Sequence, residues 1–491
     1  MRIKKSFKLI LTAFASLFVL SSCGNNSNNN QPIDTNSIFP DITNTSGDIT
    51  NTSGDQGGGV DTREIVFYST MGDALQKVAD VAIKSFEEKY PGWKITHQQP
   101  GGYNQVKDSV ISDLDAGTQP SLAYCYSDHV AQYLQSGKVL DMSKYINSLT
   151  ETDITVEGAA GDETKKAVLG YSEKDIADFI PGYYKEGFAT NYGDYKTYGF
   201  TDTSILTMPF SKSTEVLYYN ADALEEAGIA KAPATWDELW DDCRILKKKF
   251  PDCTPLGYDS EANWFITMCE QNGWDYTSID KPHYKFNNDG TVLFLEELKE
   301  LYDEGLFTTQ KKYGSYTSGL FTKGAENGSI FSIGSTGLAV HQSSDKFTVG
   351  VAPLPGSELD DNSVNKSVIF QGPSLVMFDT GSDEKAKMTW LFVKELLEPK
   401  FQCQFSMNSG YNPVRESSYD NEAYAEWLDG DGIVAKTATA AKLMINDYFT
   451  SPAFNGSATA REQVGSALVY AFTGQKPAQK ALKDAVVKCG E

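Results

Sequence analysis

Polar side chains suited to ligand binding stand where several predicted strands end. Tyr68 and Tyr126 close short β-prone segments, and Asp73 and Asp128 follow a few residues behind them. A tyrosine offers a ring face and a hydroxyl group, whereas a carboxylate accepts hydrogen bonds from ligand hydroxyls. Asp73 also falls in the first turn of a predicted helix, where negative charge is favoured in any case, so both interpretations of this residue stay open.

Residues for catalysis or metal binding do not form a recognisable motif. None of the four histidines (His97, His129, His283 and His341) pairs with another at metal-ligand spacing. Neither a G-x-S-x-G nucleophile elbow nor a G-x-x-x-x-G-K phosphate loop occurs. The 66 acidic residues could hide a paired-carboxylate glycosidase site, but no pair is singled out. We therefore predict a non-enzyme with no catalytic residue, metal or cofactor, and keep a surface glycoside hydrolase or lyase as an alternative.

An alternation of strands and helices positions these tyrosines and aspartates. Ile65 to Tyr68, Trp93 to His97 and Leu122 to Tyr126 read as strands. Apolar residues at helical spacing predict helices from Asp73 and from Tyr103 between them. This alternation is typical of a parallel sheet, in which ligands bind beyond the carboxyl ends of the strands. The sequence therefore predicts a ligand site at that edge.

A second series of elements begins after about residue 210. Thr235 and Glu238 form a capping-box pattern at the start of a helix, with Pro233 just ahead. Further expected elements are a helix near Leu293 to Tyr302, strands at Ser329 to Ile333, Val349 to Pro355 and Ser374 to Phe378, and helices from Asp383, Ala460 and Pro477. The body of the chain is therefore expected to be α/β.

The N-terminal segment predicts export and lipidation. Four basic residues precede the apolar run Leu9 to Leu20, which is too short to span about 30 Å of hydrocarbon. Leu20-Ser21-Ser22-Cys23 resembles the bacterial lipoprotein signal, whose cysteine is lipidated and becomes the new N-terminus. We expect 1–22 to be a signal peptide, Cys23 to carry the lipid, and 23–61 to be a disordered tether rich in Asn, Ser, Thr, Asp and Gly. The alternatives are an uncleaved signal anchor, or ordinary cleavage beside an incidental cysteine. The rest should lie on the extracytoplasmic face of the cell membrane.

Charge and cysteine content limit the partners and the cross-links. The formal net charge of −23 argues against nucleic-acid partners, because binding phosphates needs clustered Lys and Arg. Six cysteines follow Cys23 at irregular spacing without a C-x-x-C pair. A bridge between Cys243 and Cys253, or from either one to Cys269, stays open, and no pairing is assigned.

Several segments follow one another in a familiar order and spacing: Met208 to Leu224, Pro233 to Leu239, Gly328 to His341, Gln371 to Ser374 with Trp390 to Lys394, and Ser409 to Arg415. In these segments the chain resembles the bacterial family of extracellular solute-binding proteins for carbohydrates and glycerol phosphates. The likeness runs from about residue 62 to 487.

The resemblance implies a two-lobed α/β fold of the type II periplasmic-binding-protein kind, with the ligand in the cleft between the lobes. By that analogy, lobe I consists of 62–210 and 332–382, and lobe II of 211–331 and 383–491. Hinge crossings are expected near Pro209, Ile333 and Thr380, and such lobes close about a few hinge residues. The implied function is to capture a small polar solute for the membrane subunits of an ABC importer. A chemosensory or adhesive surface protein of the same fold is a further alternative.

Further site residues follow from the same resemblance. Ser213 and Glu215 lie in its first segment, and the family pattern puts a stacking aromatic close to Trp264, for which a buried core ring is the equal alternative. In the glycerol-phosphate branch an arginine, a Ser/Gly loop and a tyrosine occur at positions matched here, although the residues before Arg461 depart from the pattern. We predict a mono- or oligosaccharide as ligand, with glycerol 3-phosphate or a related phosphate ester as the alternative. The candidate ligand-binding residues are Tyr68, Asp73, Tyr126, Asp128, Ser213, Glu215, Trp264, Ser335, Gly372, Tyr411 and Arg461.

Overall fold

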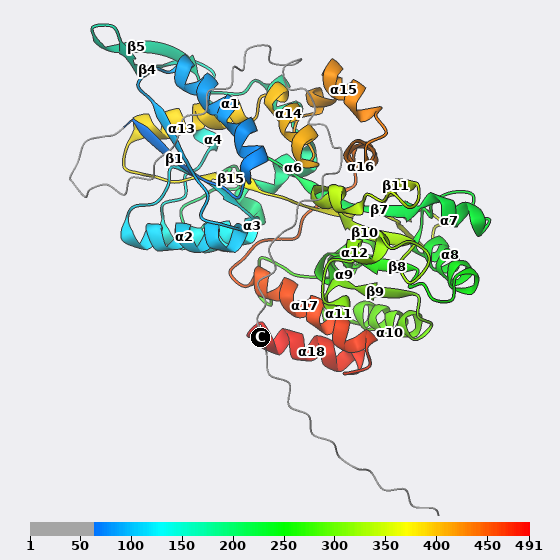
Figure 1. Cartoon of the computed structure of the whole chain (residues 1–491). Coiled ribbons are helices and arrows are strands. Elements are labelled where there is room, and N and C mark those ends of the chain that lie inside the picture. Colours follow the sequence, from blue (N-terminus) through cyan, green and yellow to red (C-terminus); the bar gives the residue numbers. More distant parts are fainter. Residues whose placement is uncertain (1–62) are drawn as a thin grey trace, which may run out of the picture. The chain divides into compact units, whose positions relative to one another are not determined.

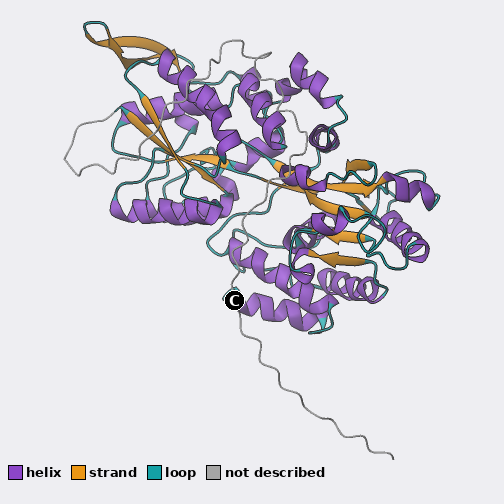
Figure 2. Ribbon diagram, viewed as in Figure 1, coloured by secondary structure: helices purple, strands orange, loops and turns teal. Residues whose placement is uncertain are grey.

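The computed structural model describes residues 63–491 of the chain. The predicted signal peptide 1–22, the lipidation site Cys23 and the tether 23–61 lie outside the described residues. Within the described part, helices and strands alternate from the first strand onwards, and the strands gather in two groups (Figure 2). The predicted α/β class is confirmed.

The first group of strands follows the predicted alternation. Strand β1 (Glu64–Tyr68) pairs in parallel with β2 (Lys94–Gln98) and with β3 (Leu122–Cys125). Helices α1 (Asp73–Lys89) and α2 (Tyr103–Ala116) connect these strands, as the apolar spacing predicts. The carboxyl ends of all three strands therefore share one edge of the sheet, and Tyr68 and Tyr126 lie at that edge.

Antiparallel strands complete this first sheet, whose order is β2-β1-β3-β15-β6. Strand β15 (Ser374–Met377) lies beside β3, and the short β6 (Met208–Pro209) lies beside β15. Helices α13 (Asp383–Leu396) and α14 (Pro399–Ser409) pack against α1. Figure 1 shows α2 along one side of this sheet and α1 with α13 along the other.

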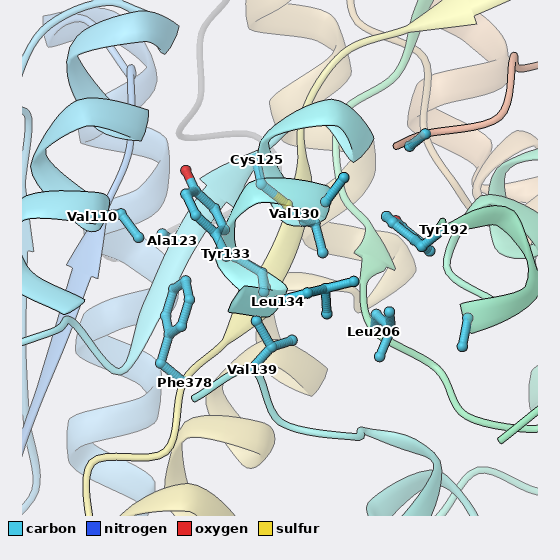
Figure 3. Packing of buried hydrophobic residues seen from close by; sticks show 14 of the residues in the cluster. Val110, Ala123, Cys125, Val130, Tyr133, Leu134, Val139, Tyr192, Leu206 and Phe378 are labelled. Carbon is cyan, nitrogen blue, oxygen red and sulfur yellow. The ribbon is translucent and has the colours of Figure 1, made fainter. Parts of the chain in front are cut away.

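A buried cluster beneath α2 and β3 stabilises this region. Val110 of α2 and Ala123 of β3 are fully buried, and the rings of Tyr133 and Phe378 meet edge to face with centroids 5.6 Å apart. Figure 3 shows these side chains together with Leu206, which arrives from a distant part of the chain. Burying such apolar side chains stabilises the fold by roughly 1.5–3 kcal/mol each.

The second sheet has seven strands, in the order β16-β14-β7-β10-β8-β9 with β11 paired to β7. Its central strand β7 (Ser213–Asn220) runs antiparallel to β10, β11 and β14. The other strands are β8 (Leu256–Tyr258), β9 (Phe307–Thr309), β10 (Phe331–Ser335), β11 (Val349–Pro353), β14 (Val368–Gln371) and β16 (Tyr448–Phe449).

Long helices surround the second sheet (Figure 1). They are α8 (Trp236–Lys249), α9 (Glu261–Asn272), α10 (Asp289–Asp303), α17 (Ser457–Phe472) and α18 (Ala478–Lys488). One half of the predicted capping box of α8 is present, since Thr235 Oγ1 accepts a hydrogen bond from the Glu238 backbone N–H at 3.3 Å, whereas the Glu238 carboxylate accepts from the Ala234 backbone N–H at 2.7 Å instead of from Thr235. Such a cap stabilises a helix by about 1 kcal/mol.

The remaining elements are short. They are α3 (Ser127–Tyr133), α4 (Ser143–Ile146), β4 (Glu151–Gly158), β5 (Gly161–Val168), α5 (Glu173–Ala177), α6 (Pro181–Glu186), α7 (Ala221–Glu226), α11 (Gln310–Tyr313), α12 (Ser318–Phe321), β12 (Ser357–Glu358), β13 (Val364–Asn365), α15 (Glu422–Leu428) and α16 (Ile433–Lys442), with 3₁₀ turns at Leu134–Ser136, Ala189–Asn191, Thr336–Gln342 and Glu416–Asp420. Strands β4 and β5 form a separate antiparallel hairpin.

Strand pairing corrects part of the predicted lobes. The segment 332–382 was expected in lobe I, but β10, β11 and β14 all pair in the second sheet, and only β15 joins the first. Helices α13 and α14 were expected in lobe II, yet they pack against α1 of the first. A run of buried apolar residues can pack in either sheet. Long-range pairing decides which sheet a strand joins, and the local sequence pattern does not specify that pairing.

Three passages of the chain therefore run between the sheets: from β6 to β7, from β14 to β15, and from β15 through α13 and α14 to β16, which pairs in the second sheet. The first passes Pro209 as predicted. The second runs through Gly372 and Pro373, whereas the predicted crossings near Ile333 and Thr380 are wrong, because Ile333 pairs with Leu217 inside the second sheet and Thr380 follows β15.

Cysteine pairing and membrane-crossing helices were also tested. Cys125, Cys243, Cys253, Cys269, Cys403 and Cys489 are all free, so none of the disulfides left open forms. Between residues 63 and 491, no helix has both the length and the apolar content needed to cross a bilayer.

Candidate ligand-binding site

Three tyrosines from separate parts of the chain come together beyond the first sheet. Tyr103 opens α2, Tyr126 follows β3, and Tyr411 follows α14. The rings of Tyr103 and Tyr126 lie with centroids 4.5 Å apart, and the hydroxyl oxygens of Tyr103 and Tyr411 are 3.3 Å apart. Burial raises the pKa of all three hydroxyls, so they stay neutral and can both donate and accept hydrogen bonds. We call these residues the tyrosine cluster.

Asp128 adds an unpaired acceptor next to the tyrosine cluster. It lies in the first turn of α3, directly after Tyr126, and its Oδ1 atom is buried without a hydrogen-bond partner in the described part of the chain. Its Oδ1 atom is 3.8 Å from His129 Nε2, and burial lowers the pKa of that imidazole. A buried carboxylate oxygen without a donor is costly, and a ligand hydroxyl would satisfy it.

Arg461 supplies a positive charge from the second sheet's side. It lies on α17, and its Nη2 atom donates to Asn263 Oδ1 on α9. The guanidinium lowers the pKa of the Tyr126 hydroxyl and Asp128 raises it, although burial of the ring dominates both effects. Tyr126 therefore lies within electrostatic reach of both a carboxylate and a guanidinium.

Asn263 joins Arg461 to a buried carboxylate. Its Nδ2 atom donates to Glu215 Oε1 at 2.9 Å and to Gln371 Oε1 at 3.1 Å. The hydroxyl of Tyr258 donates to Glu215 Oε2 at 2.6 Å. Burial raises the pKa of Glu215 to about 7, and hydrogen bonds from Tyr258 and Asn263 together with the charge of Arg461 offset only part of that rise. Glu215 is thus a second-sheet carboxylate that titrates close to neutrality.

The predicted Ser/Gly loop lies beside the tyrosine cluster. Ser335 Oγ accepts a hydrogen bond from the Gly337 backbone N–H at 3.2 Å. A Cβ atom on Gly337 would lie 3.3 Å from the Tyr411 ring, so the loop approaches that ring closely. Ser335 also stands opposite Glu215 in the β7–β10 register, which connects the loop to the Asn263 network.

Gly372 and Ser213 act through the backbone at the second crossing. Gly372 has a φ of +96°, and a Cβ atom there would lie 2.2 Å from the Ser211 carbonyl oxygen. Only glycine fits this position, so its role is to let two chain segments pass closely. Ser213 is 6% exposed and pairs with Gln371 between β7 and β14.

Two predicted residues lie elsewhere. Tyr68 donates its hydroxyl to Asp113 at 2.9 Å, in a separate groove lined by Gln98 and Ser109. Asp73 is exposed at the first position of α1. Neither residue has a described contact with the tyrosine cluster.

Trp264 belongs to the hydrophobic core, which corrects its assignment as a stacking platform. It is 0% exposed, and its ring is stacked by Tyr258 and Trp236 at centroid distances of 4.6 and 6.0 Å. Partner rings already stack against it, so its faces are not free for a sugar to stack on. Its neighbour Asn263 points into the site network instead.

Two groups near the site were missed at the sequence level. Its spacing predicts Tyr103 only as a member of an apolar helix face. The signal that was missed is its position at the start of α2, beyond β2, which is the same sheet edge as that of Tyr126. Tyr276 has a buried hydroxyl without a partner in the described residues, and Arg461 is close enough to oppose the rise that burial causes in its pKa. Tyr276 has no local signal, because it follows a turn and is positioned by tertiary packing.

Among residues 63–491, no group of three or more His, Cys, Asp or Glu side chains is arranged to hold a metal ion. The polar groups described above are instead tyrosine hydroxyls, one unpaired carboxylate oxygen and one guanidinium, a set that suits a small polar ligand.

Comparisons with known proteins agree with this geometry. The sn-glycerol-3-phosphate-binding periplasmic protein UgpB of Yersinia pseudotuberculosis is 24% identical over 440 residues, covering 86% of this chain and 90% of that protein. The sugar-binding protein MalE from Xanthomonas citri has a TM-score of 0.68 at 18% identity, covering 86% of this chain and 95% of that one. UgpB from Mycobacterium tuberculosis, solved with glycerophosphocholine, has a TM-score of 0.65 at 17% identity and covers 88% of this chain and 98% of that one.

The structural likenesses confirm the predicted two-lobed fold. The profile of one family, described as bacterial extracellular solute-binding protein, matches residues 81–429, which is more than half of the chain. The protein belongs to the bacterial extracellular solute-binding proteins.

Proposed function

We propose that this protein is the substrate-binding subunit of an ABC importer and that it captures a carbohydrate, either a mono- or an oligosaccharide. One observation carries the choice of ligand. The tyrosine cluster and the unpaired Asp128 Oδ1 bring ring surface, neutral hydroxyls and a free acceptor together from α2, α3 and the segment after α14. Sugars present C–H faces and many hydroxyls, which need these groups.

A phosphate ester such as glycerol 3-phosphate is the second candidate, and Arg461 favours it. A guanidinium that reaches the same cluster can pair with a phosphate more strongly than with a neutral hydroxyl. Relatives named for sn-glycerol 3-phosphate binding cover most of the chain. In this alternative the hydroxyl of Ser335 and the backbone of the adjoining loop would contribute further donors.

Two variants, one isosteric and one truncating, distinguish between these two ligand classes. For a neutral oligosaccharide, we expect Asp128→Asn to weaken binding at least tenfold and Arg461→Ala to change it little. For glycerol 3-phosphate, we expect Arg461→Ala to weaken binding at least a hundredfold, because loss of a buried charge partner costs several kcal/mol. Isothermal titration calorimetry on purified protein measures both.

A preceding thermal-shift screen with sugars and glycerol phosphates identifies the ligand, since a molecule that binds only the folded state raises the melting temperature. If no member of either class raises it, the proposal fails. Chromatography of the ligand after incubation tests the hydrolase alternative, and a converted product would replace solute capture with catalysis.

Membrane attachment is part of the proposal. The Leu20-Ser21-Ser22-Cys23 sequence supports lipidation of Cys23, which would tether the binding domain outside the cell near the importer. We expect wild-type protein to fractionate with membranes and Cys23→Ser protein to be released or retained as uncleaved precursor. Equal membrane fractionation and equal mature mass for both proteins would contradict it.

A further inference from the structure

A cavity separate from the tyrosine cluster lies at the far side of α9. It has a volume of about 230 Å³ and is enclosed by α8, α9, α10 and β12. Trp236, Trp240, Trp264 and Trp274 all line it, which is four of the seven tryptophans in the chain. Trp236, Trp240 and Trp264 are each at most 6% exposed, whereas Trp274 is half-buried and offers the most ring surface to the cavity.

Carboxylates from three elements line the same cavity. Asp237 is on α8, Glu297 on α10 and Glu358 on β12, and no Lys, Arg or His is among the lining residues. All three residues are solvent-exposed, so their charges stand at the open rim. The Glu297 carboxyl is partly desolvated even though the residue as a whole is exposed, and this burial, followed by the nearby charge of Asp237, raises its pKa.

One buried polar group in the wall lacks a partner. Trp264 is 0% exposed, and its Nε1–H donates to no acceptor in the described part of the chain. By contrast, the neighbouring Trp236 Nε1–H is satisfied by Gln271 Oε1 at 2.8 Å. An unsatisfied buried donor costs free energy, and an oxygen atom on a bound molecule would relieve that cost.

These features together define one ligand class. The carboxylates at the rim would repel an anion, and a purely apolar molecule would form no interaction with them. No trio of ligating side chains within residues 63–491 is placed for a metal ion. Indole faces and carboxylates attract organic cations, and tryptophan is the strongest side chain for this purpose. We propose that this cavity is a binding site for a small organic cation of the amino-alcohol type, with an ammonium group and a hydroxyl oxygen.

The cavity is distinct from the solute site. None of Tyr126, Asp128 and Arg461 lines it. Helix α9 contributes to both sites through adjacent residues, since Asn263 joins the Glu215 and Arg461 network while Trp264 lines the cavity. A cation bound here would therefore contact the helix that also orients Arg461.

Choline chloride is the test probe, with 3,3-dimethyl-1-butanol as its neutral isostere at the same ionic strength. Tryptophan fluorescence reports on occupancy, because most of the emitting rings line the cavity, and calorimetry gives the affinity. We expect saturable choline binding, with the neutral alcohol at least tenfold weaker. Equal binding of the two molecules, or no choline binding, would overturn the proposal.

Variants locate the bound choline. Asp237→Asn/Glu297→Gln should weaken choline binding at least tenfold, because it removes two rim charges while keeping side-chain shape. The matched control Asp241→Asn/Glu296→Gln removes two exposed charges from the same helices outside the cavity and should leave affinity unchanged. Choline binding that survives the first variant but is lost in Arg461→Ala would place choline at the solute site and refute the cavity.

Discussion

Two buried glutamates in this protein have opposite surroundings. Glu186 is 6% exposed and binds the ammonium of Lys212, which is itself 0% exposed, at the crossing between the sheets. Glu215 is 3% exposed in the second sheet and receives its hydrogen bonds from the neutral groups of Tyr258 and Asn263. Similar burial therefore has two outcomes. Lys212 compensates the charge of Glu186 at the crossing, whereas the carboxyl of Glu215 beside the site titrates near pH 7.

The crossing is also the more completely hydrogen-bonded region. Lys212 Nζ donates to Ser374 Oγ at 2.8 Å and to the Gly372 carbonyl at 3.1 Å. Ser127 Oγ donates to the other oxygen of Glu186 at 3.0 Å, one residue before Asp128. The protein therefore pairs its buried charge where the sheets connect. Close to the proposed ligand site, by contrast, the charge of Glu215 can change with pH.

Removing the ammonium should give the largest effect. Lys212→Met leaves Glu186 buried without its cation, and we expect a loss of about 3–5 kcal/mol in the free energy of unfolding. Urea unfolding measures it. The double variant Lys212→Met/Glu186→Gln should recover part of the lost free energy of unfolding, because it also removes the unpaired charge of Glu186. A small loss in the single variant would show that the pair is not what stabilises the crossing.

Titration of Glu215 should give a smaller, pH-dependent effect. Its folded-state pKa of about 7 lies above the ordinary glutamate pKa of 4.5, so the folded protein holds a proton that the unfolded chain has released between these pH values. This contribution is therefore fully present below about pH 4.5 and is lost as pH rises through about 7, with a total on the order of 3 kcal/mol.

Glu215→Gln removes this titration while keeping the shape of the side chain. The variant should therefore gain stability relative to wild type as pH increases from 5 to 8, which unfolding at several pH values would detect. A stability difference that stays constant over this range would mean that Glu215 does not titrate there, and the contrast with Glu186 would disappear.

Local pattern predicted the first sheet well. Apolar residues of α1 recur at helical spacing, and Ala79, Ala82 and Phe86 are buried on that face. The pairing of β1 with β2 and β3 then follows from short connections between parallel strands. The strand-end rule likewise predicted Tyr126 and Asp128 at the carboxyl edge of this sheet, where both follow β3.

Long-range strand pairing and side-chain direction could not be predicted from the sequence. Nothing local distinguishes β10 as a partner of β7 rather than of the first sheet, because all but one of its residues are buried in either case. Asn263 and Trp264 are neighbours, yet one faces the Arg461 network and the other the aromatic core. Adjacent residues of a helix point about 100° apart, and only packing decides which of the two faces which environment.

The paired crossings have a mechanical consequence. Strands β6 and β15 are hydrogen-bonded at one end, and β7 and β14 at the other, and the third passage joins them where Asn412 pairs with Lys212. Sliding one linker past another would break these backbone bonds and separate the Lys212 ammonium from its acceptors. Bending and twisting the linkers together keep the bonds intact, so we expect rotation rather than sliding between the halves that they connect.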